Sequence, residues 1–177
     1  SNKVTFGEDS LYINGGILAD EVGLGKTLMS INLISKNPKP NTLILAPKSL
    51  IIQWKKEFEK FAKSISVEVT DDNTYNFNKN LNKIHVVIAS HSRLNSKSVT
   101  DFNDISFCKN KWDRVIIDEA HIIKNKLSKI HKACCCLKTD IRWALTATPV
   151  MNKMEDFVYM LKWIGVPRHI CQNYKLD

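Results

Sequence analysis

A glycine-rich stretch ending in Gly-Lys-Thr offers the clearest chemistry in the sequence. It spans residues 20–27, Asp-Glu-Val-Gly-Leu-Gly-Lys-Thr, between apolar runs at 16–19 and 28–34. That order predicts a strand, a loop and a helix, an arrangement that wraps phosphates with backbone N–H groups and a helix N-terminus. Lys26 would neutralise the β- and γ-phosphates, and the Thr27 hydroxyl would bind Mg²⁺. The stretch therefore predicts a nucleoside triphosphate site.

The loop departs from the strict phosphate-binding pattern at one position, because Asp20 stands where that pattern has glycine. On its own the loop could therefore be a glycine-rich turn in an ordinary strand–loop–helix unit. The residues predicted to contact the nucleotide are Asp20, Glu21, Gly23, Leu24, Gly25, Lys26 and Thr27.

A second cluster of reactive residues follows an apolar run at 114–117. Asp118 and Glu119 stand directly after that run, with Ala and His next. In an open α/β sheet, ligands bind at the carboxyl ends of the strands, which is where these two carboxylates would fall. Asp118 can hold Mg²⁺ largely through water, and Glu119 can orient and deprotonate an attacking water. We predict Glu119, Asp118 and Lys26 as the catalytic residues.

Apolar runs that read as strands alternate with helical patterns along most of the chain. The alternation predicts a three-layer, doubly wound, mostly parallel α/β sheet of the phosphate-loop NTPase type. Strands are predicted at 16–19, 42–46, 66–69, 84–89, 114–118 and 142–146, and helices at 26–35, 50–61, 126–137 and 153–164.

Three local features carry their own predictions. Ser49 is predicted to cap the helix after Pro47, and Asn152 to begin a capping box with Glu155. Trp54, Phe58 and Phe61 recur at helical spacing and are predicted to lie in the core.

Composition narrows the class of partner. The 177 residues carry a net charge of +8, which suits a polyanionic partner, although a lysine- and asparagine-rich composition would give the same excess. No apolar run approaches the length of a membrane span, so no membrane partner is predicted. Five cysteines, three of them adjacent, favour a reducing, intracellular compartment over a disulfide framework.

Four motifs in chain order resemble the core of superfamily 2 helicases, and more closely the Swi/Snf family of DNA-translocating ATPases. They are Gly-Leu-Gly-Lys-Thr at 23–27, the segment 43–54, Asp-Glu-Ala-His at 118–121 and Leu-Thr-Ala-Thr-Pro at 145–149. In that family Asp occupies the position of Asp20. The segments 132–135 and 142–146 most resemble the branch that contains RING-bearing DNA repair translocases.

The resemblance implies ATP and Mg²⁺ as ligands, and DNA-dependent ATP hydrolysis that drives movement along double-stranded DNA in remodelling or repair. His121, Thr146 and Thr148 would couple the nucleotide site to the rest of the motor. The residues implied to contact backbone phosphates are Pro47, Lys48, Ser49, Ser90, His91 and Lys124. Lys48 could instead be a solvated lysine, and the run from Lys124 to Lys132 a solvated face.

The resemblance also divides the chain. Residues 1–14 would be an N-terminal segment that could include residues left by cloning, 15–167 a RecA-like ATP-binding lobe, and 168–177 the start of a linker to a second lobe. Without that lobe and its arginine finger, the fragment is expected to hydrolyse ATP barely. The implied location is the nucleus in a eukaryote, otherwise the cytoplasm or a viral factory. The alternatives are an RNA- or DNA-unwinding helicase and a nucleotide-gated binding module without turnover.

Overall fold

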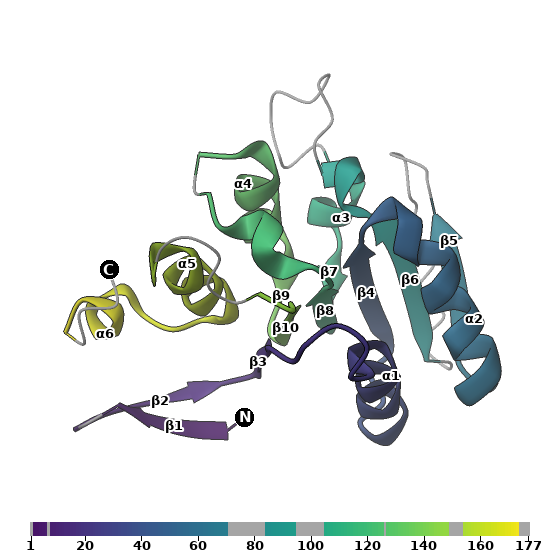
Figure 1. Ribbon diagram of the computed structural model, residues 1–177, viewed down its shortest axis with the longest axis horizontal. Helices are drawn as coiled ribbons and strands as arrows, with labels where there is room; N and C mark the ends of the chain where they lie inside the picture. The colour runs from purple at the N-terminus through teal and green to yellow at the C-terminus, as the bar shows by residue number, and fades with distance from the viewer. Residues whose placement is uncertain are drawn as a thin grey trace.

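A six-stranded, wholly parallel sheet forms the centre of the molecule, with its strands in the order β3-β10-β8-β4-β6-β5 (Figure 1). The computed structural model describes residues 2–6, 8–70, 84–94, 105–125, 127–148 and 154–173. The strands are β3 (Gly15–Leu18), β4 (Asn41–Ala46), β5 (Ser66–Thr70), β6 (His85–Ser90), β8 (Arg114–Ile117) and β10 (Arg142–Leu145).

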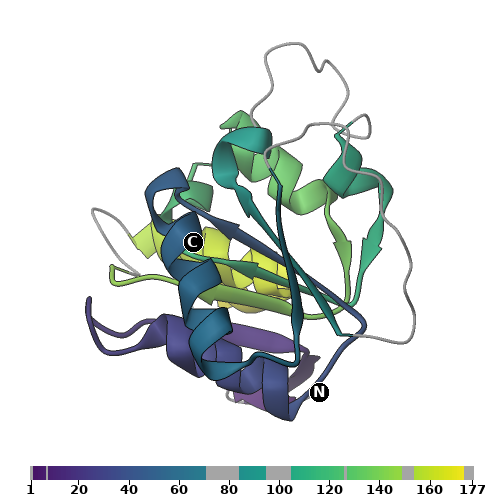
Figure 2. The same ribbon diagram turned by 90° about the vertical axis from the view of Figure 1, so that its right-hand side faces the viewer.

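Helices cover both faces of the sheet, which makes three layers. Helices α1 (Lys26–Lys36) and α2 (Ile51–Phe61) lie on one face. The other face carries α3 (Ser106–Lys109), α4 (Lys129–Cys136) and α5 (Met154–Ile164), followed in the chain by α6 (Arg168–Asn173). In the turned view, α1 and α2 stand in front of the sheet and the yellow C-terminal helices behind it (Figure 2).

The central strand β4 shows why this sequence forms a covered sheet. All six of its residues are buried, and its side chains alternate between the two cores. Leu43 and Leu45 pack with the α3–α5 layer, whereas Ile44 and Ala46 pack with α1 and α2. Burying an aliphatic side chain contributes about 1.5–3 kcal/mol, so a strand that is apolar on both faces is stable only between two helical layers.

The predicted strands and main helices are confirmed, with boundaries that differ by one to three residues. Several short elements were not predicted. Strand β1 (Asn2–Phe6) pairs antiparallel with β2 (Asp9–Ile13), and β7 (Lys111–Trp112) pairs in parallel with β9 (Lys138–Thr139). The start of the expected linker, up to residue 173, forms α6. No helix in the described part of the chain is long and apolar enough to cross a membrane.

The capping prediction for Ser49 is wrong. The chain makes a 3-10 turn, η1 (Lys48–Leu50), before α2 begins, so Ser49 lies inside that turn. The turn is closed by a hydrogen bond from the Leu50 amide to the Pro47 carbonyl, and α2 has no side-chain cap. Asn152 lies outside the described residues, so the predicted capping box stays a prediction.

Gly15 stands where two strands come closest. Its φ is +136°, and a Cβ built on it would lie 1.8 Å from the carbonyl oxygen of Arg142 on β10. Gly165 also has a positive φ, +110°, but a Cβ there would meet nothing within 4 Å. Gly15 is therefore required both for its backbone angle and for its missing side chain.

We expect Gly15→Ala to lower the free energy of unfolding by about 3 kcal/mol or more, because backbone strain and a clash with β10 add together. The matched variant Gly165→Ala introduces backbone strain without a clash, so its free energy of unfolding should fall by only about 1–2 kcal/mol. Urea denaturation of both variants measures the difference. Equal losses would show that β3 and β10 are not packed as closely as described.

Candidate nucleotide site

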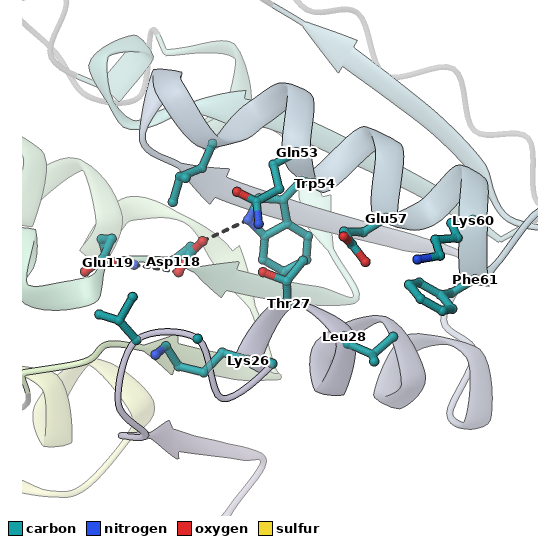
Figure 3. Close-up of a pocket in the computed structure, with 14 residues that line it drawn as sticks. Lys26, Thr27, Leu28, Gln53, Trp54, Glu57, Lys60, Phe61, Asp118 and Glu119 are labelled. Carbon is teal, nitrogen blue, oxygen red and sulfur yellow. Dashed lines mark hydrogen bonds between the residues drawn. The ribbon is translucent and has the colours of Figure 1, made fainter.

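The carboxyl ends of β3, β8 and β4 meet at one edge of the sheet, beside the start of α1 and α2. A cavity of about 450 Å³ opens there (Figure 3). Its lining combines the loop before α1, the first turn of α1, one side of α2 and the end of β8. The lining residues are Val22, Gly23, Gly25, Lys26, Thr27, Leu28, Leu50, Gln53, Trp54, Glu57, Lys60, Phe61, Asp118 and Glu119.

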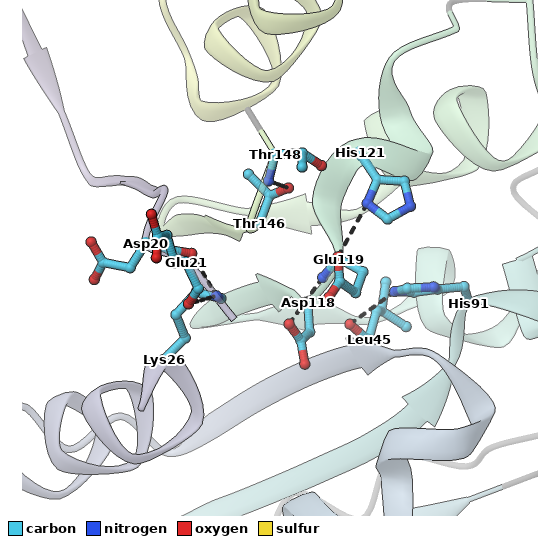
Figure 4. Close-up of polar contacts among 10 residues, drawn as sticks. All are labelled: Asp20, Glu21, Lys26, Leu45, His91, Asp118, Glu119, His121, Thr146 and Thr148. Atoms are coloured by element: carbon cyan, nitrogen blue, oxygen red, sulfur yellow. Dashed lines mark hydrogen bonds and ion pairs between the residues drawn. The ribbon is translucent and has the colours of Figure 1, made fainter. Parts of the chain in front are cut away.

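The loop before α1 has the geometry of an anion cradle. Gly23 and Gly25 adopt φ values of +87° and +79°, which glycine reaches without strain. The Nζ of Lys26 donates hydrogen bonds to the carbonyl oxygens of Asp20 at 2.7 Å and Glu21 at 2.9 Å (Figure 4). The lysine is therefore folded onto its own loop, and its charge meets no carboxylate there.

Asp118 is a buried carboxylate with a defined donor on each oxygen. Its Oδ1 accepts from the backbone amide of Glu119 at 2.9 Å, and its Oδ2 accepts from the indole Nε1 of Trp54 at 2.8 Å. The backbone amide of Asp118 donates to the Leu45 carbonyl, which continues the β8–β4 pairing by one residue. These bonds fix the carboxylate at the cavity floor.

Glu119 is held in a backbone conformation that an L-residue rarely adopts. Its φ and ψ are +51° and +50°, and within the described ranges no other non-glycine residue has a positive φ. Its Oε2 lies 3.2 Å from the Nδ1 of His121, although the two do not form a well-aligned hydrogen bond. Left-handed residues concentrate at functional sites, where surrounding structure sustains the strain.

The donor set suits a hydrated Mg²⁺ beside a triphosphate. Mg²⁺ prefers oxygen ligands and keeps several waters, so a hydroxyl and one carboxylate are enough protein partners. Thr27 and Asp118 offer those groups and line the same cavity. The fold thus brings together the four residues predicted to bind phosphate or Mg²⁺ or to activate water: Lys26, Thr27, Asp118 and Glu119.

A model of the SNF2-related domain matches residues 4–173. The chain belongs to this family. It is 34% identical to DNA repair protein RAD5 of Yarrowia lipolytica over 181 residues, which cover 90% of this chain and 18% of that protein. It is 33% identical to DNA repair protein RAD5B of Arabidopsis thaliana, covering 86% of this chain and 15% of that protein. The chain therefore spans less than a fifth of these curated relatives.

Solved structures give the same assignment. The Sulfolobus solfataricus SWI2/SNF2 ATPase core in complex with dsDNA matches with a TM-score of 0.70 and 30% identity, over 84% of this chain and 31% of that one. The ATPase core domain from the same organism matches with a TM-score of 0.68 at 29% identity, over 85% of this chain and 30% of that one. The family predicted from the motifs and the fold predicted from the alternating strands and helices are confirmed.

Three loop residues predicted to contact nucleotide do not line the cavity of this SNF2-related domain. The backbone carbonyls of Asp20 and Glu21 hold Lys26, and the side chain of Leu24 is exposed. Their direct contact with nucleotide stays a prediction.

Two residues predicted to contact DNA are buried. Ser90 is 3% exposed and His91 7% exposed, and contact of either residue with DNA stays a prediction. The Nε2 of His91 donates to the carbonyl of Leu45 at 3.1 Å, the same carbonyl that accepts from the Asp118 amide. Burial lowers the pKa of His91, so acid below the ordinary histidine pKa favours the unfolded state. Through its bond to Leu45, His91 links the end of β6 to the end of β4 beside Asp118.

The other predicted DNA contacts lie nearer the surface. Lys48 and Ser49 are exposed in η1 at the carboxyl end of β4, Pro47 is half-buried before them, and Lys124 is half-buried after the turn η4 (Ala120–Ile123). Whether these residues contact DNA stays a prediction.

The residues predicted to couple the site show mainly local bonding. Thr146 is fully buried, and its Oγ1 accepts from the Thr148 amide at 3.1 Å. Thr148 itself is exposed, and His121 reaches only the Glu119 carboxylate among the contacts drawn in Figure 4. Ala147, between the two threonines, does not have a positive φ, so alanine fits there without backbone strain.

The sequence reading missed the α2 side of the cavity. Trp54 and Phe58 are buried as predicted, but Phe61 is 48% exposed and lines the cavity, so its core assignment is wrong. The Nζ of Lys60 lies 4.8 Å from the Phe61 ring centre, a cation–π contact. Phe61 is the last residue of α2, and its ring faces the cavity. Helical spacing was the only sequence signal for these aromatic residues, and it does not distinguish a buried ring from an exposed ring that lines a cavity.

We expect Glu119→Gly to raise the free energy of unfolding by about 1 kcal/mol, because glycine relieves the left-handed strain at that residue. The control Glu57→Gly removes a carboxylate from the same cavity but stands inside α2, so it should lose about 1 kcal/mol. Urea denaturation compares the two. A loss at both positions would contradict strain at Glu119.

Proposed function

We propose that this domain is the ATP-binding and hydrolysing lobe of an ATPase that moves along double-stranded DNA. The observation that carries the proposal is the meeting of Lys26, Thr27, Asp118 and Glu119 in one cavity at the carboxyl edge of the sheet. The similarity to the SWI2/SNF2 core in complex with dsDNA supports DNA as the track.

The residues divide the chemistry between binding and water activation. The N–H groups of the loop and Lys26 would hold the β- and γ-phosphates, with Lys26 exchanging its two loop carbonyls for phosphate oxygens. Thr27 and Asp118 would hold Mg²⁺, largely through water; when bound, it supplies positive charge that offsets the charge on the phosphates. Glu119 would orient the attacking water and take its proton, leaving ADP and phosphate.

DNA would lie along the same edge of the sheet. Lys48 and Ser49 extend from η1, next to the strand end that carries Asp118, and can bind backbone phosphates without reading bases. A second RecA-like lobe would complete the motor by adding an arginine finger. The names of the similar DNA repair proteins favour a nuclear repair role for the whole protein.

ATP hydrolysis by the full-length protein, measured alone, with duplex DNA and with RNA, tests the proposal. Stimulation by duplex DNA without strand separation supports a translocase. Stimulation with unwinding would indicate a helicase instead, and nucleotide binding without turnover would indicate a binding module.

Lys26→Ala and Glu119→Gln should fail in different ways. Lys26 contacts bound phosphates, so its loss should weaken both nucleotide binding and turnover. Glu119 acts on the water, so Glu119→Gln should bind ATP normally and lower kcat by about 10²–10⁴-fold. Binding of a fluorescent ATP analogue and steady-state kinetics separate the two, with Glu57→Gln as the control from the same cavity. Normal hydrolysis by Glu119→Gln would remove Glu119 as the base.

Lys48→Ala should weaken duplex binding equally on unrelated sequences. One lost phosphate contact should lower the slope of log affinity against log salt by about 0.9. Lys36→Ala is the matched control, because Lys36 ends α1 at the opposite edge of the sheet. Fluorescence anisotropy on two duplexes over a salt series gives both quantities. An unchanged slope would show that Lys48 is a solvated lysine.

A further inference from the structure

Trp54 makes a side-chain contact with the carboxylate of the nucleotide site that its place in the core does not require. Its ring is 1% exposed, and its Nε1 donates to Oδ2 of Asp118 at 2.8 Å (Figure 3). Both residues are buried, which limits the competition of water for the bond. A hydrogen bond to an ionised acceptor in such surroundings is stronger than one between neutral groups.

The bond completes the support of the Asp118 carboxylate. Oδ1 is held by the Glu119 amide and Oδ2 by Trp54, so rotation of the carboxylate would break one or both bonds. Each oxygen keeps a free lone-pair direction for a water. Groups that hydrogen-bond to metal-holding side chains commonly set their orientation.

Trp54 in turn is fixed to α2. It lies one turn into the helix, and its ring packs against Phe58 with centroids 6.3 Å apart. Ile31 and Ile34 of α1 belong to the same buried cluster. The indole therefore has no room to swing independently, and a shift of the start of α2 would carry the N–H with it.

The start of α2 is also the end of the surface turn that carries Lys48 and Ser49. The turn η1 ends at Leu50 and α2 begins at Ile51, with no residue between them. The path from that turn to the Asp118 carboxylate therefore runs through a few helical residues and one hydrogen bond.

We propose that Trp54 is a positioning residue that ties Asp118 to the start of α2, so that a polyanion bound at the η1 turn changes how Asp118 holds Mg²⁺. The inference rests on the proposed function for the identity of the polyanion, a DNA backbone. The coupling is reciprocal for binding: Mg²⁺ and nucleotide bound at Asp118 change the affinity for the polyanion at η1 by the same factor.

The test replaces Trp54 by Phe in the full-length protein. Two other buried tryptophans supply matched controls, because Trp112 and Trp163 donate their Nε1 to the backbone carbonyls of Phe107 and Cys134, away from the cavity. Each Trp→Phe change removes the same ring and donor. Only Trp54→Phe should raise the Mg²⁺ concentration for half-maximal nucleotide binding, by about 10–100-fold.

Two further measurements separate positioning from packing. In an Asp118→Asn background, Trp54→Phe should add little to the Mg²⁺ effect, because the two residues act through one bond. In the protein labelled with 5-fluorotryptophan, the ¹⁹F signal of Trp54 should move on adding Mg²⁺ with a non-hydrolysable ATP analogue, and again on adding duplex DNA. The signal is assigned from its loss in Trp54→Phe. It can also be assigned as the signal that remains unassigned after Trp→Phe changes at the other three tryptophans. The ¹⁹F result does not depend on the variant at Trp54 folding.

Specific outcomes overturn the proposal. If Trp54→Phe and Trp112→Phe have the same Mg²⁺ dependence, or if the ¹⁹F signal of Trp54 does not respond to Mg²⁺ and nucleotide, Trp54 is only a core residue. If the signal responds to nucleotide but not to DNA, the link to η1 is wrong. A wild-type protein whose hydrolysis ignores DNA would refute the proposed function, whereas the Mg²⁺ titration would still report on the Trp54–Asp118 bond.

Discussion

The parallel pairing of β8 with β4 on one side and β10 on the other determines where every reactive group lies. The β8–β4 pairing continues one residue past β8, where the Asp118 amide donates to the Leu45 carbonyl. The pairing of β10 with β3, on its other side, likewise continues one residue past β10, where the Thr146 amide donates to the Leu18 carbonyl. Because side chains alternate along a strand, a slip of one residue would turn Asp118 away from the cavity. The phosphate loop can face a carboxylate only while this register holds.

Much of this arrangement is readable from the sequence. Strands buried on both faces appear as uninterrupted apolar runs, and β4 and β8 show this clearly. Once the runs are strands of one parallel sheet, the residues after them share an edge, so Lys26 and Asp118 are predicted to meet although they are far apart in the chain.

The features that the sequence does not predict depend on tertiary contacts. Trp54 and Phe61 share a helix and a helical spacing and both line the cavity, yet Trp54 is buried and Phe61 is 48% exposed. His91 looks like a polar residue after a strand, but its ring is buried and donates to the Leu45 carbonyl on β4, which also accepts from the Asp118 amide. The left-handed backbone of Glu119 has no signal at all, because no residue type at that position demands it.

The Trp54–Asp118 pair joins two groups that are each costly to bury. An indole N–H without an acceptor and a carboxylate without donors both destabilise a folded domain, and one bond of 2.8 Å satisfies part of each need. Stability alone does not account for the pair, since replacing a buried polar pair by apolar groups of similar shape is often neutral. Under the proposed function, a carboxylate at this position would face bound Mg²⁺ and phosphate. The pair is therefore better understood as a requirement of the site, one that makes α2 part of the machinery rather than a cover for the sheet.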